Sequence, residues 1–275
     1  MPRLVVFSDL DGTLLAHADY DWTPARPALE ALERRRVPLV LASSKTRAEI
    51  EAWRARLGNH DPFISENGGA LYVPEGAVPG PLTDATAVEG YRRIEFGAPY
   101  ARLRATLGEI GRALGVPLRG FGDMSLAEIA RRTGLPEADA ALAARREYDE
   151  PFVPARALSE NEHARLDAIA AEMGLRTTRG GRFHHLLGAS SKARAARRLV
   201  DAYAAGGERV VTLALGDGAN DLELLAAADR AVVVARPDGS HAPELSRGLP
   251  QATFTRAPGP AGFAEAVLGA LEADA

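Results

Sequence analysis

The chain opens with a short apolar segment that ends in two acidic residues. Residues 4–7 read Leu-Val-Val-Phe, and Asp9 and Asp11 follow just before Gly12. Two carboxylates this close raise each other's pKa unless a cation or hydrogen bonds hold them apart. In open α/β sheets, ligands bind at the carboxyl ends of the strands. The pattern therefore predicts a buried strand that ends at a reactive site. There one carboxylate could attack, its neighbour could move protons, and a hard cation such as Mg²⁺ could bind.

Two plainer interpretations apply to the same residues. Asp-Gly is a common turn dipeptide, so Asp11 and Gly12 alone would indicate no more than a turn. An EF-hand loop also begins Asp-x-Asp, but it needs a glutamate at its twelfth position. The twelfth residue counted from Asp9 is Tyr20, which excludes the EF-hand. The simple turn stays open on these residues alone.

Strand and helix patterns alternate on both sides of a long middle segment. Up to residue 73, short apolar runs alternate with segments of helical periodicity, and the same order resumes near Lys192. This order is typical of a parallel sheet covered by helices on both faces. We expect strands at residues 4–7, 38–41, 62–65, 70–73, 210–216 and 231–235, and helices at 24–36, 46–57, 219–228 and from Lys192 onward.

The middle of the chain follows a different pattern. Residues 74–90 are rich in proline and small turn-forming residues and predict a linker. Capping boxes at Ser125 and Ser159 predict two helix starts, and further strands and a helix are expected at 91–96, 99–114, 175–178 and 183–187. The fold is thus predicted to be an α/β core, residues 1–83 and 187–275, with an α/β cap domain inserted at 84–186.

Composition excludes several classes of protein. The chain has no cysteine, which excludes disulfides and cysteine-bound zinc, and its net charge of −4 argues against nucleic acid as a partner. No segment approaches the roughly 20 apolar residues of a membrane span, and no signal peptide is evident, so we expect a cytoplasmic protein. Scarce Met, Asn and Gln suit a thermophile, although coding bias toward Ala, Arg, Gly and Pro would give the same composition.

Further polar residues follow strand ends in an order that matches a known family. Leu-Ala-Ser at 41–43 ends one expected strand, Lys192 opens a helix, and Leu-Gly-Asp-Gly-Ala-Asn-Asp at 215–221 ends another strand. With Asp-Leu-Asp-Gly-Thr at 9–13, these motifs resemble the four of the haloacid dehalogenase-like phosphohydrolases. Each lies where backbone N–H groups favour anions. The resemblance implies a Rossmann-like core that performs the chemistry and a cap that selects the substrate.

Two rare residue types also stand out at these motifs. Lys45 and Lys192 are the only lysines among 33 basic residues, and each follows a Ser-Ser pair. In an arginine-rich chain, a lysine suggests a need for a compact charge on a flexible stem. The alternative is two surface lysines placed by chance. Asparagine is similarly rare, and Asn67 and Asn220 lie in Glu-Asn-Gly-Gly at 66–69 and in the fourth motif.

The resemblance implies a two-step hydrolysis of a phosphate ester. Asp9 would attack phosphorus and form an aspartyl-phosphate, while Asp11 would act first as a general acid and then as a general base. Ser43 and Lys192 would bind the phosphoryl oxygens.

The resemblance also implies a metal site. Mg²⁺ would be held by Asp9, Asp217 and the backbone carbonyl of Asp11, and would neutralise charge on the phosphoryl oxygens. Asn220 and Asp221 would support and orient these groups. Whether Asp221 also ligates the metal stays open.

Longer sequence segments, called strings here, narrow the resemblance to one group within the family. Those at 43–47, 133–135, 145–152 and 180–184 look like strings of the mannosyl-3-phosphoglycerate phosphatases, and the likeness spans nearly the whole chain. It implies hydrolysis of mannosyl-3-phosphoglycerate to phosphate and mannosylglycerate, a compatible solute. Hydrolysis of glucosyl-3-phosphoglycerate or another sugar phosphate is an alternative, as is a phosphomutase. A non-catalytic binding module would be expected to have lost Asp9 or Asp11.

The implied substrate carries a phosphate, a carboxylate and sugar hydroxyls. An arginine fork suits the carboxylate, and Arg182 is the first choice. His184 and His185 alternate across an expected strand, so only one can face a cleft. Each candidate could equally be an ordinary solvated side chain. The expected substrate-binding residues are Ser43, Ser44, Lys45, Glu66, Asn67, Glu150, Arg179, Gly181, Arg182, His184 and Lys192.

Overall fold

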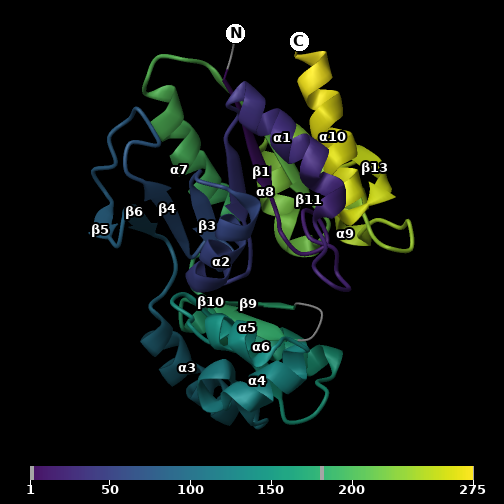
Figure 1. Ribbon diagram of the computed structural model, residues 1–275. Coiled ribbons are helices and arrows are strands. Elements are labelled where there is room, and N and C mark those ends of the chain that lie inside the picture. The colour runs from purple at the N-terminus through teal and green to yellow at the C-terminus, as the bar shows by residue number, and fades with distance from the viewer. Residues whose placement is uncertain (1–2, 180–182, 275) are drawn as a thin grey trace.

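The computed structural model describes residues 3–179 and 183–274 and contains two β-sheets. A nine-stranded sheet and its helices form the larger part of the molecule, and a four-stranded sheet forms the smaller part (Figure 1). The predicted α/β architecture is confirmed. Among the described residues, no helix has both the length and the apolar character needed to cross a membrane.

The large sheet is mainly parallel. Across the sheet, neighbouring strands pair in parallel as far as the sixth strand, and the last three strands pair antiparallel. In order across the sheet, the strands are β13 (Thr253–Pro258), β12 (Arg230–Ala235), β11 (Val210–Gly216), β1 (Arg3–Ser8), β2 (Leu39–Ala42), β3 (Phe63–Ser65), β4 (Ala70–Pro74), β6 (Tyr91–Glu95) and β5 (Thr86–Val88).

Helices cover both faces of this sheet because its central strands are apolar on both sides. In β1, Val6 packs into one hydrophobic cluster, whereas Val5 and Phe7 pack into the other. Full burial of each such side chain stabilises the fold by roughly 1.5–3 kcal/mol. The first face is covered by α1 (Arg26–Arg35), α2 (Arg47–Leu57) and α10 (Gly259–Ala273), and the second by α7 (Lys192–Ala204), α8 (Leu222–Ala227) and α9 (Pro243–Gly248).

The small sheet is antiparallel and runs β7 (Leu118–Gly120), β8 (Asp149–Pro154), β10 (His184–Leu187) and β9 (Arg176–Arg179). Phe152 and Leu186 point from one face into a cluster with α3 (Tyr100–Leu114) and α6 (Glu160–Glu172). These helices lie on the side away from the large sheet (Figure 1). A further pair, α4 (Leu126–Thr133) and α5 (Glu137–Ala143), packs around Phe121, and α5 contacts α2. Short 3-10 turns lie at Thr23–Ala25, Phe121–Asp123 and Ala219–Asp221.

Most expected elements form close to their predicted positions, but β5 and β6 differ. We predicted a linker at 74–90 and a cap from residue 84, yet β6 pairs with β4 and β5 pairs with β6 in the large sheet. Ile94 of β6 packs into a large-sheet cluster, which explains this placement. The start of the small sheet therefore does not coincide with the predicted boundary at 84. The elements β13, α10, α9, α5 and β7 were not predicted.

Candidate active site

Three neighbouring strands, β11, β1 and β2, end at the same edge of the large sheet. Asp9 follows β1, Ser43 follows β2 and Asp217 follows β11. Parallel pairing brings the three side chains together at this edge. All three residues are buried, with exposures of 5%, 1% and 6%. The motifs at these strand ends thus share one place in the fold.

Lys192 reaches the same place from the start of α7, where the Ser191 hydroxyl accepts a hydrogen bond from the Arg194 N–H and caps the helix. Its Nζ lies 2.7 Å from Asp9 Oδ1 and 2.7 Å from Asp221 Oδ1. One ammonium group therefore donates to two buried carboxylates. A compact cation suits this position better than a planar guanidinium.

The carboxylates share an environment that disfavours their negative charge. Burial raises the pKa of Asp9, Lys192 opposes that rise, and the neighbouring carboxylates add to it. Burial also raises the pKa of Asp221, again against Lys192. Burial would lower the pKa of Lys192, but Asp221 and Asp9 together hold it above its ordinary value. The site carries more negative charge than Lys192 alone balances.

This excess charge fits a metal ion. Asp9, Asp217 and Asp221 offer carboxylate oxygens that lie within 4.8 Å of one another. Buried oxygen donors that lack positive charge suit a hard cation such as Mg²⁺. The two oxygens of Asp221 already accept hydrogen bonds, from Lys192 Nζ at 2.7 Å and from Gly218 N at 3.1 Å. Asp221 is therefore well placed to hold Lys192 and the loop of the fourth motif.

His17 is a neighbour of Asp217 that the sequence analysis missed. Its Nε2 lies 3.1 Å from Asp217 Oδ2, and this hydrogen bond raises the pKa of His17. Gly12 lies against this pair with a φ of +81°, and a Cβ there would lie 2.2 Å from His17 Nε2 and 2.5 Å from Asp217 Oδ2. Only glycine fits that position without strain. His17 belongs to no motif, so nothing in the sequence distinguished it from the other histidines.

Asp11 pairs with Lys45 instead of joining the three carboxylates. Lys45 Nζ lies 2.9 Å from Asp11 Oδ2, 4.0 Å from Glu49 Oε1 and 4.9 Å from the centre of the Tyr20 ring. Asp11 Oδ1 is buried and accepts no hydrogen bond from the described residues. Both scarce lysines thus contact carboxylates of the first motif: Lys192 contacts Asp9, and Lys45 contacts Asp11.

The Glu-Asn-Gly-Gly turn approaches the site from the end of β3. Glu66, Asn67 and Gly68 all have positive φ angles, of 48°, 56° and 88°. Asn67 Oδ1 accepts a hydrogen bond from Asn220 Nδ2 at 3.4 Å, which links two rare asparagines of separate motifs. A Cβ on Gly68 would lie 2.5 Å from the backbone nitrogen of Lys192, so the turn packs directly on the start of α7.

Glu66 joins the two parts of the molecule. Its carboxylate accepts hydrogen bonds from the backbone N–H groups of Glu147, at 2.9 Å, and Tyr148, at 2.6 Å. Burial raises the pKa of Glu66 to about 8, against the opposing charge of Arg146. Glu66 is completely buried, so its carboxylate is occupied by the chain itself.

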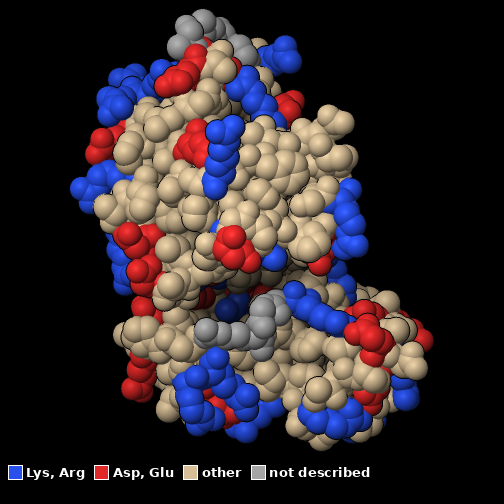
Figure 2. All heavy atoms as spheres, turned by 90° about the vertical axis from the view of Figure 1, so that its right-hand side faces the viewer, with Lys and Arg blue, Asp and Glu red and all other residues tan. Residues whose placement is uncertain are grey.

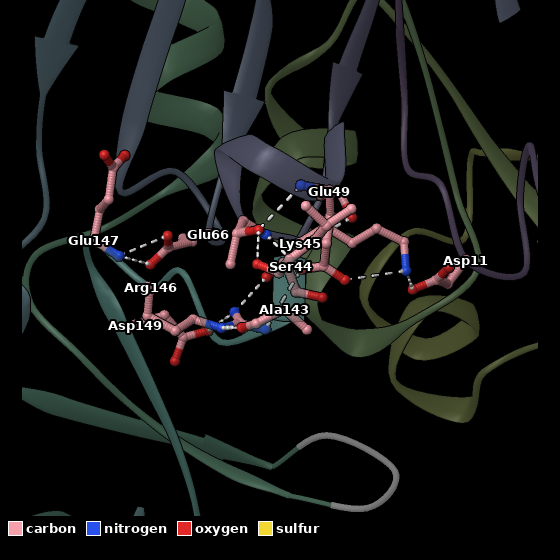
Figure 3. A network of polar contacts seen from close by, with 12 residues as sticks. Asp11, Ser44, Lys45, Glu49, Glu66, Ala143, Arg146, Glu147 and Asp149 are labelled. Carbon is pink, nitrogen blue, oxygen red and sulfur yellow. Dashed lines mark hydrogen bonds and ion pairs between the residues drawn. The ribbon is translucent and has the colours of Figure 1, made fainter. Parts of the chain in front are cut away.

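Arg146 forms a second link between the two parts (Figure 3). Its guanidinium donates to the carbonyl oxygens of Ser44, at 2.9 Å, and Ala143, at 2.8 Å. It also lies 3.6 Å from Asp149 and 3.8 Å from Glu49. The Ser44 side of this contact lies in the loop that carries Ser43 and Lys45, so the small sheet is tied to the second motif. Arg146 was within a noted string but was not predicted as a site residue.

The substrate-binding residues predicted in the small sheet lie apart from this network. His184 stacks between Phe152 and His163 of α6, and Arg179 lies 3.9 Å from Glu160 of the same helix. Both therefore lie on the helix-covered face. Glu150 is on that face too and accepts a hydrogen bond from Gly122 N at 3.1 Å. Gly181 and Arg182 lie outside the described residues.

A hollow separates the two parts of the molecule on one side (Figure 2), and atoms of a lysine or arginine are visible inside it. The smaller part in this view contains the small sheet, and the larger part contains the large sheet. The arrangement combines buried carboxylates, a buried ammonium group and an adjoining space, which suits the binding and reaction of a small anionic molecule.

Comparisons with known proteins agree with this chemistry. Residues 6–78 match the family model of haloacid dehalogenase-like hydrolases. A glucosyl-3-phosphoglycerate/mannosyl-3-phosphoglycerate phosphatase of Methanococcoides burtonii is 40% identical over 266 residues, 96% of each chain, and one of Persephonella marina is 35% identical over the same shares. The structure of the Synechocystis sucrose-phosphatase, with sucrose and phosphate, has a TM-score of 0.62 at 17% identity and 98% coverage of both chains. The chain belongs to the haloacid dehalogenase-like hydrolases and is a phosphatase of that family.

Proposed function

We propose that this phosphatase hydrolyses mannosyl-3-phosphoglycerate, and also glucosyl-3-phosphoglycerate, to phosphate and the corresponding sugar-glycerate. The names of two relatives that match along nearly their whole length support this substrate class, and both names include both sugars. The observation that carries the proposal is the buried Asp9 carboxylate held by Lys192 at the end of β1. A nucleophile and its counter-charge are present where a phosphoryl group would bind.

The reaction would proceed in two steps, formation of an aspartyl-phosphate and its hydrolysis. In the first, an Asp9 oxygen attacks phosphorus, the bond from phosphorus to the glycerate oxygen breaks, and Asp11 gives that oxygen a proton. In the second, Asp11 takes a proton from water, the water oxygen attacks phosphorus, and inorganic phosphate leaves Asp9. The contact of Asp11 with Lys45 would hold the carboxylate in place between the steps.

Phosphoryl oxygens would be bound by Lys192 and Ser43. The Ser43 Oγ accepts a hydrogen bond from Lys45 N at 3.2 Å, which leaves its own hydrogen to donate to a phosphoryl oxygen. Mg²⁺, held by Asp9, Asp217 and the Asp11 carbonyl, would supply further neutralisation of charge on these oxygens.

Phosphate release with and without Mg²⁺ tests the proposal. Four esters would be compared: mannosyl-3-phosphoglycerate, glucosyl-3-phosphoglycerate, mannose 6-phosphate and 3-phosphoglycerate. We expect Mg²⁺-dependent release that strongly favours the two sugar-phosphoglycerates. Similar rates on mannose 6-phosphate would overturn the substrate class while retaining the chemistry. No release from any ester would favour a phosphomutase.

A further inference from the structure

The second face of the small sheet carries polar residues that point toward the large sheet. Three residues that pair across β8, β10 and β9 share this face, namely Asp149, Leu187 and Arg176. His185 lies on the same face because it is two residues from Leu187 along β10. Arg176 donates to the carbonyl oxygen of Ser190 and lies 3.9 Å from Glu223 of α8. These contacts show that this face of the small sheet is turned toward the large sheet and its helices.

His185 is held on this face by a buried carboxylate. Its Nδ1 lies 2.8 Å from Asp149 Oδ2 and 3.1 Å from Oδ1. Asp149 is fully buried, and the Arg146 guanidinium lies 3.6 Å from it on another side. A carboxylate that accepts the Nδ1 hydrogen determines both the orientation and the tautomer of an imidazole.

The opposite ring nitrogen of His185 is available to a ligand. Within the described part of the chain, the structure gives Nε2 no hydrogen-bond partner, and the side chain is 15% exposed. In a neutral imidazole whose Nδ1 carries the hydrogen, Nε2 is an acceptor. An acceptor matches a hydroxyl group and not a carboxylate.

We propose that His185 is a substrate-binding residue whose Nε2 accepts a hydrogen bond from a sugar hydroxyl of the leaving group, with Asp149 as its positioning residue. This inference rests on the proposed function, since it assumes a sugar in the leaving group. It replaces His184, the sequence-based choice, with the neighbour on the opposite face of β10. The pair gives the small sheet a direct part in substrate selection.

Two substitutions of His185 test the roles of its two ring nitrogens separately. In His185→Asn, the amide nitrogen can take the place of Nδ1 and still donate to Asp149, but nothing reaches the position of Nε2. In His185→Gln, a polar atom reaches the position of Nε2, but Asp149 loses its donor. His184→Asn is the matched control on the other face.

The readout is a ratio of kcat/KM values, that for mannosyl-3-phosphoglycerate divided by that for 4-nitrophenyl phosphate, whose leaving group has no hydroxyl to donate. We expect His185→Asn to lower this ratio by roughly ten- to a hundredfold, because the sugar hydroxyl would be left without its hydrogen-bond partner. His185→Gln should retain more of the ratio but unfold at lower urea concentration. Damage to the fold alone would lower both values and leave the ratio unchanged.

An unchanged ratio in His185→Asn, or a larger fall in His184→Asn, would overturn the inference. Failure of the proposed function has a different signature. The wild-type chain would then turn over 4-nitrophenyl phosphate but neither sugar-phosphoglycerate. In that case the same ratio, measured with mannose 6-phosphate, decides whether His185 contacts a sugar hydroxyl.

Discussion

The ammonium group of Lys192 lies 2.7 Å from the Asp9 carboxylate, although 183 positions separate the two residues along the chain. The same group holds Asp221 at an equal distance. The candidate nucleophile is therefore positioned by a residue at a helix start and by an acid of the fourth motif. This arrangement links the energetics of the fold to the chemistry of the site.

Lys192→Met should abolish turnover and destabilise the protein. It leaves two buried carboxylates without their counter-charge, and breaking a buried ion pair typically costs about 3–5 kcal/mol. Lys192→Arg should recover part of the stability without the activity, because a planar guanidinium cannot occupy the place of Nζ. Urea unfolding and phosphate release measure the two effects, with Arg198→Met, at a surface ion pair with Asp84, as the comparison. Near-normal turnover in Lys192→Met would contradict the assignment.

Asp217→Asn should weaken the apparent affinity of the enzyme for Mg²⁺. Asparagine keeps the size of the side chain but removes the charge that a hard cation requires. The Mg²⁺ concentration for half-maximal phosphate release should rise by at least about tenfold, in line with the effect of altering groups around a metal. Asp238→Asn, in an exposed turn, is the control. An identical Mg²⁺ titration for Asp217→Asn and the wild type would exclude Asp217 as a ligand.

Gly68→Ala should reduce activity without touching a reacting group. Its Cβ would lie 2.2 Å from the carbonyl carbon of Ser191 and 2.5 Å from Lys192 N, so the start of α7 must move. Gly58→Ala is a matched control, because Gly58 also has a positive φ, +65°, but has nothing within 4 Å of a Cβ. Both variants carry backbone strain, and only Gly68→Ala should displace Nζ of Lys192.

Measured kcat values should therefore fall by about tenfold or more in Gly68→Ala, consistent with a small misplacement at a reacting centre. Gly58→Ala should keep its kcat while losing roughly 1–2 kcal/mol of stability. Equal kcat losses in the two variants would show that strain, and not the contact with α7, is responsible.

Glu66→Gln should change how stability depends on pH. Burial raises the pKa of Glu66 to about 8 from an ordinary value of 4.5. The unfolded chain therefore releases this proton first as pH rises. The stabilising contribution of the protonated group is complete below pH 4.5 and is lost between pH 4.5 and about 8.

The variant lacks this titration. Its free energy of unfolding, relative to the wild type, should rise across that window by up to about 1.4 kcal/mol per pH unit and then level off. Urea unfolding at a series of pH values measures the difference. A difference that stays constant from pH 4.5 to 8 would mean that Glu66 keeps an ordinary pKa in the folded protein.

The sequence predicted the large sheet and the edge at which the candidate site lies, because both depend on local patterns. Apolar runs followed by Asp9, Ser43 and Asp217 identify strand ends, and parallel pairing brings strand ends together. Lys192 stood out by the scarcity of lysine. These signals need no knowledge of distant contacts.

Other features depend on contacts that no local pattern records. Alternation showed that only one of His184 and His185 could face the large sheet, but the choice depends on which face α3 and α6 cover. Arg146 and His17 contact residues 102 and 200 positions away, Ser44 and Asp217. The strands β5 and β6 lie in or beside a segment whose prolines and glycines resemble a linker. Their place was determined by the pairing of β6 with β4 and of β5 with β6.

The role of Asp9 as the nucleophile is tested most directly by trapping the covalent intermediate during turnover of mannosyl-3-phosphoglycerate. Acid quenching followed by borohydride reduction converts an aspartyl-phosphate to homoserine, which peptide mass spectrometry can locate. We expect homoserine at position 9 only when substrate is present, and none in the Asp9→Asn variant, which keeps Asp11. Homoserine at another aspartate, or none while phosphate is released, would contradict the assignment of Asp9 as the nucleophile.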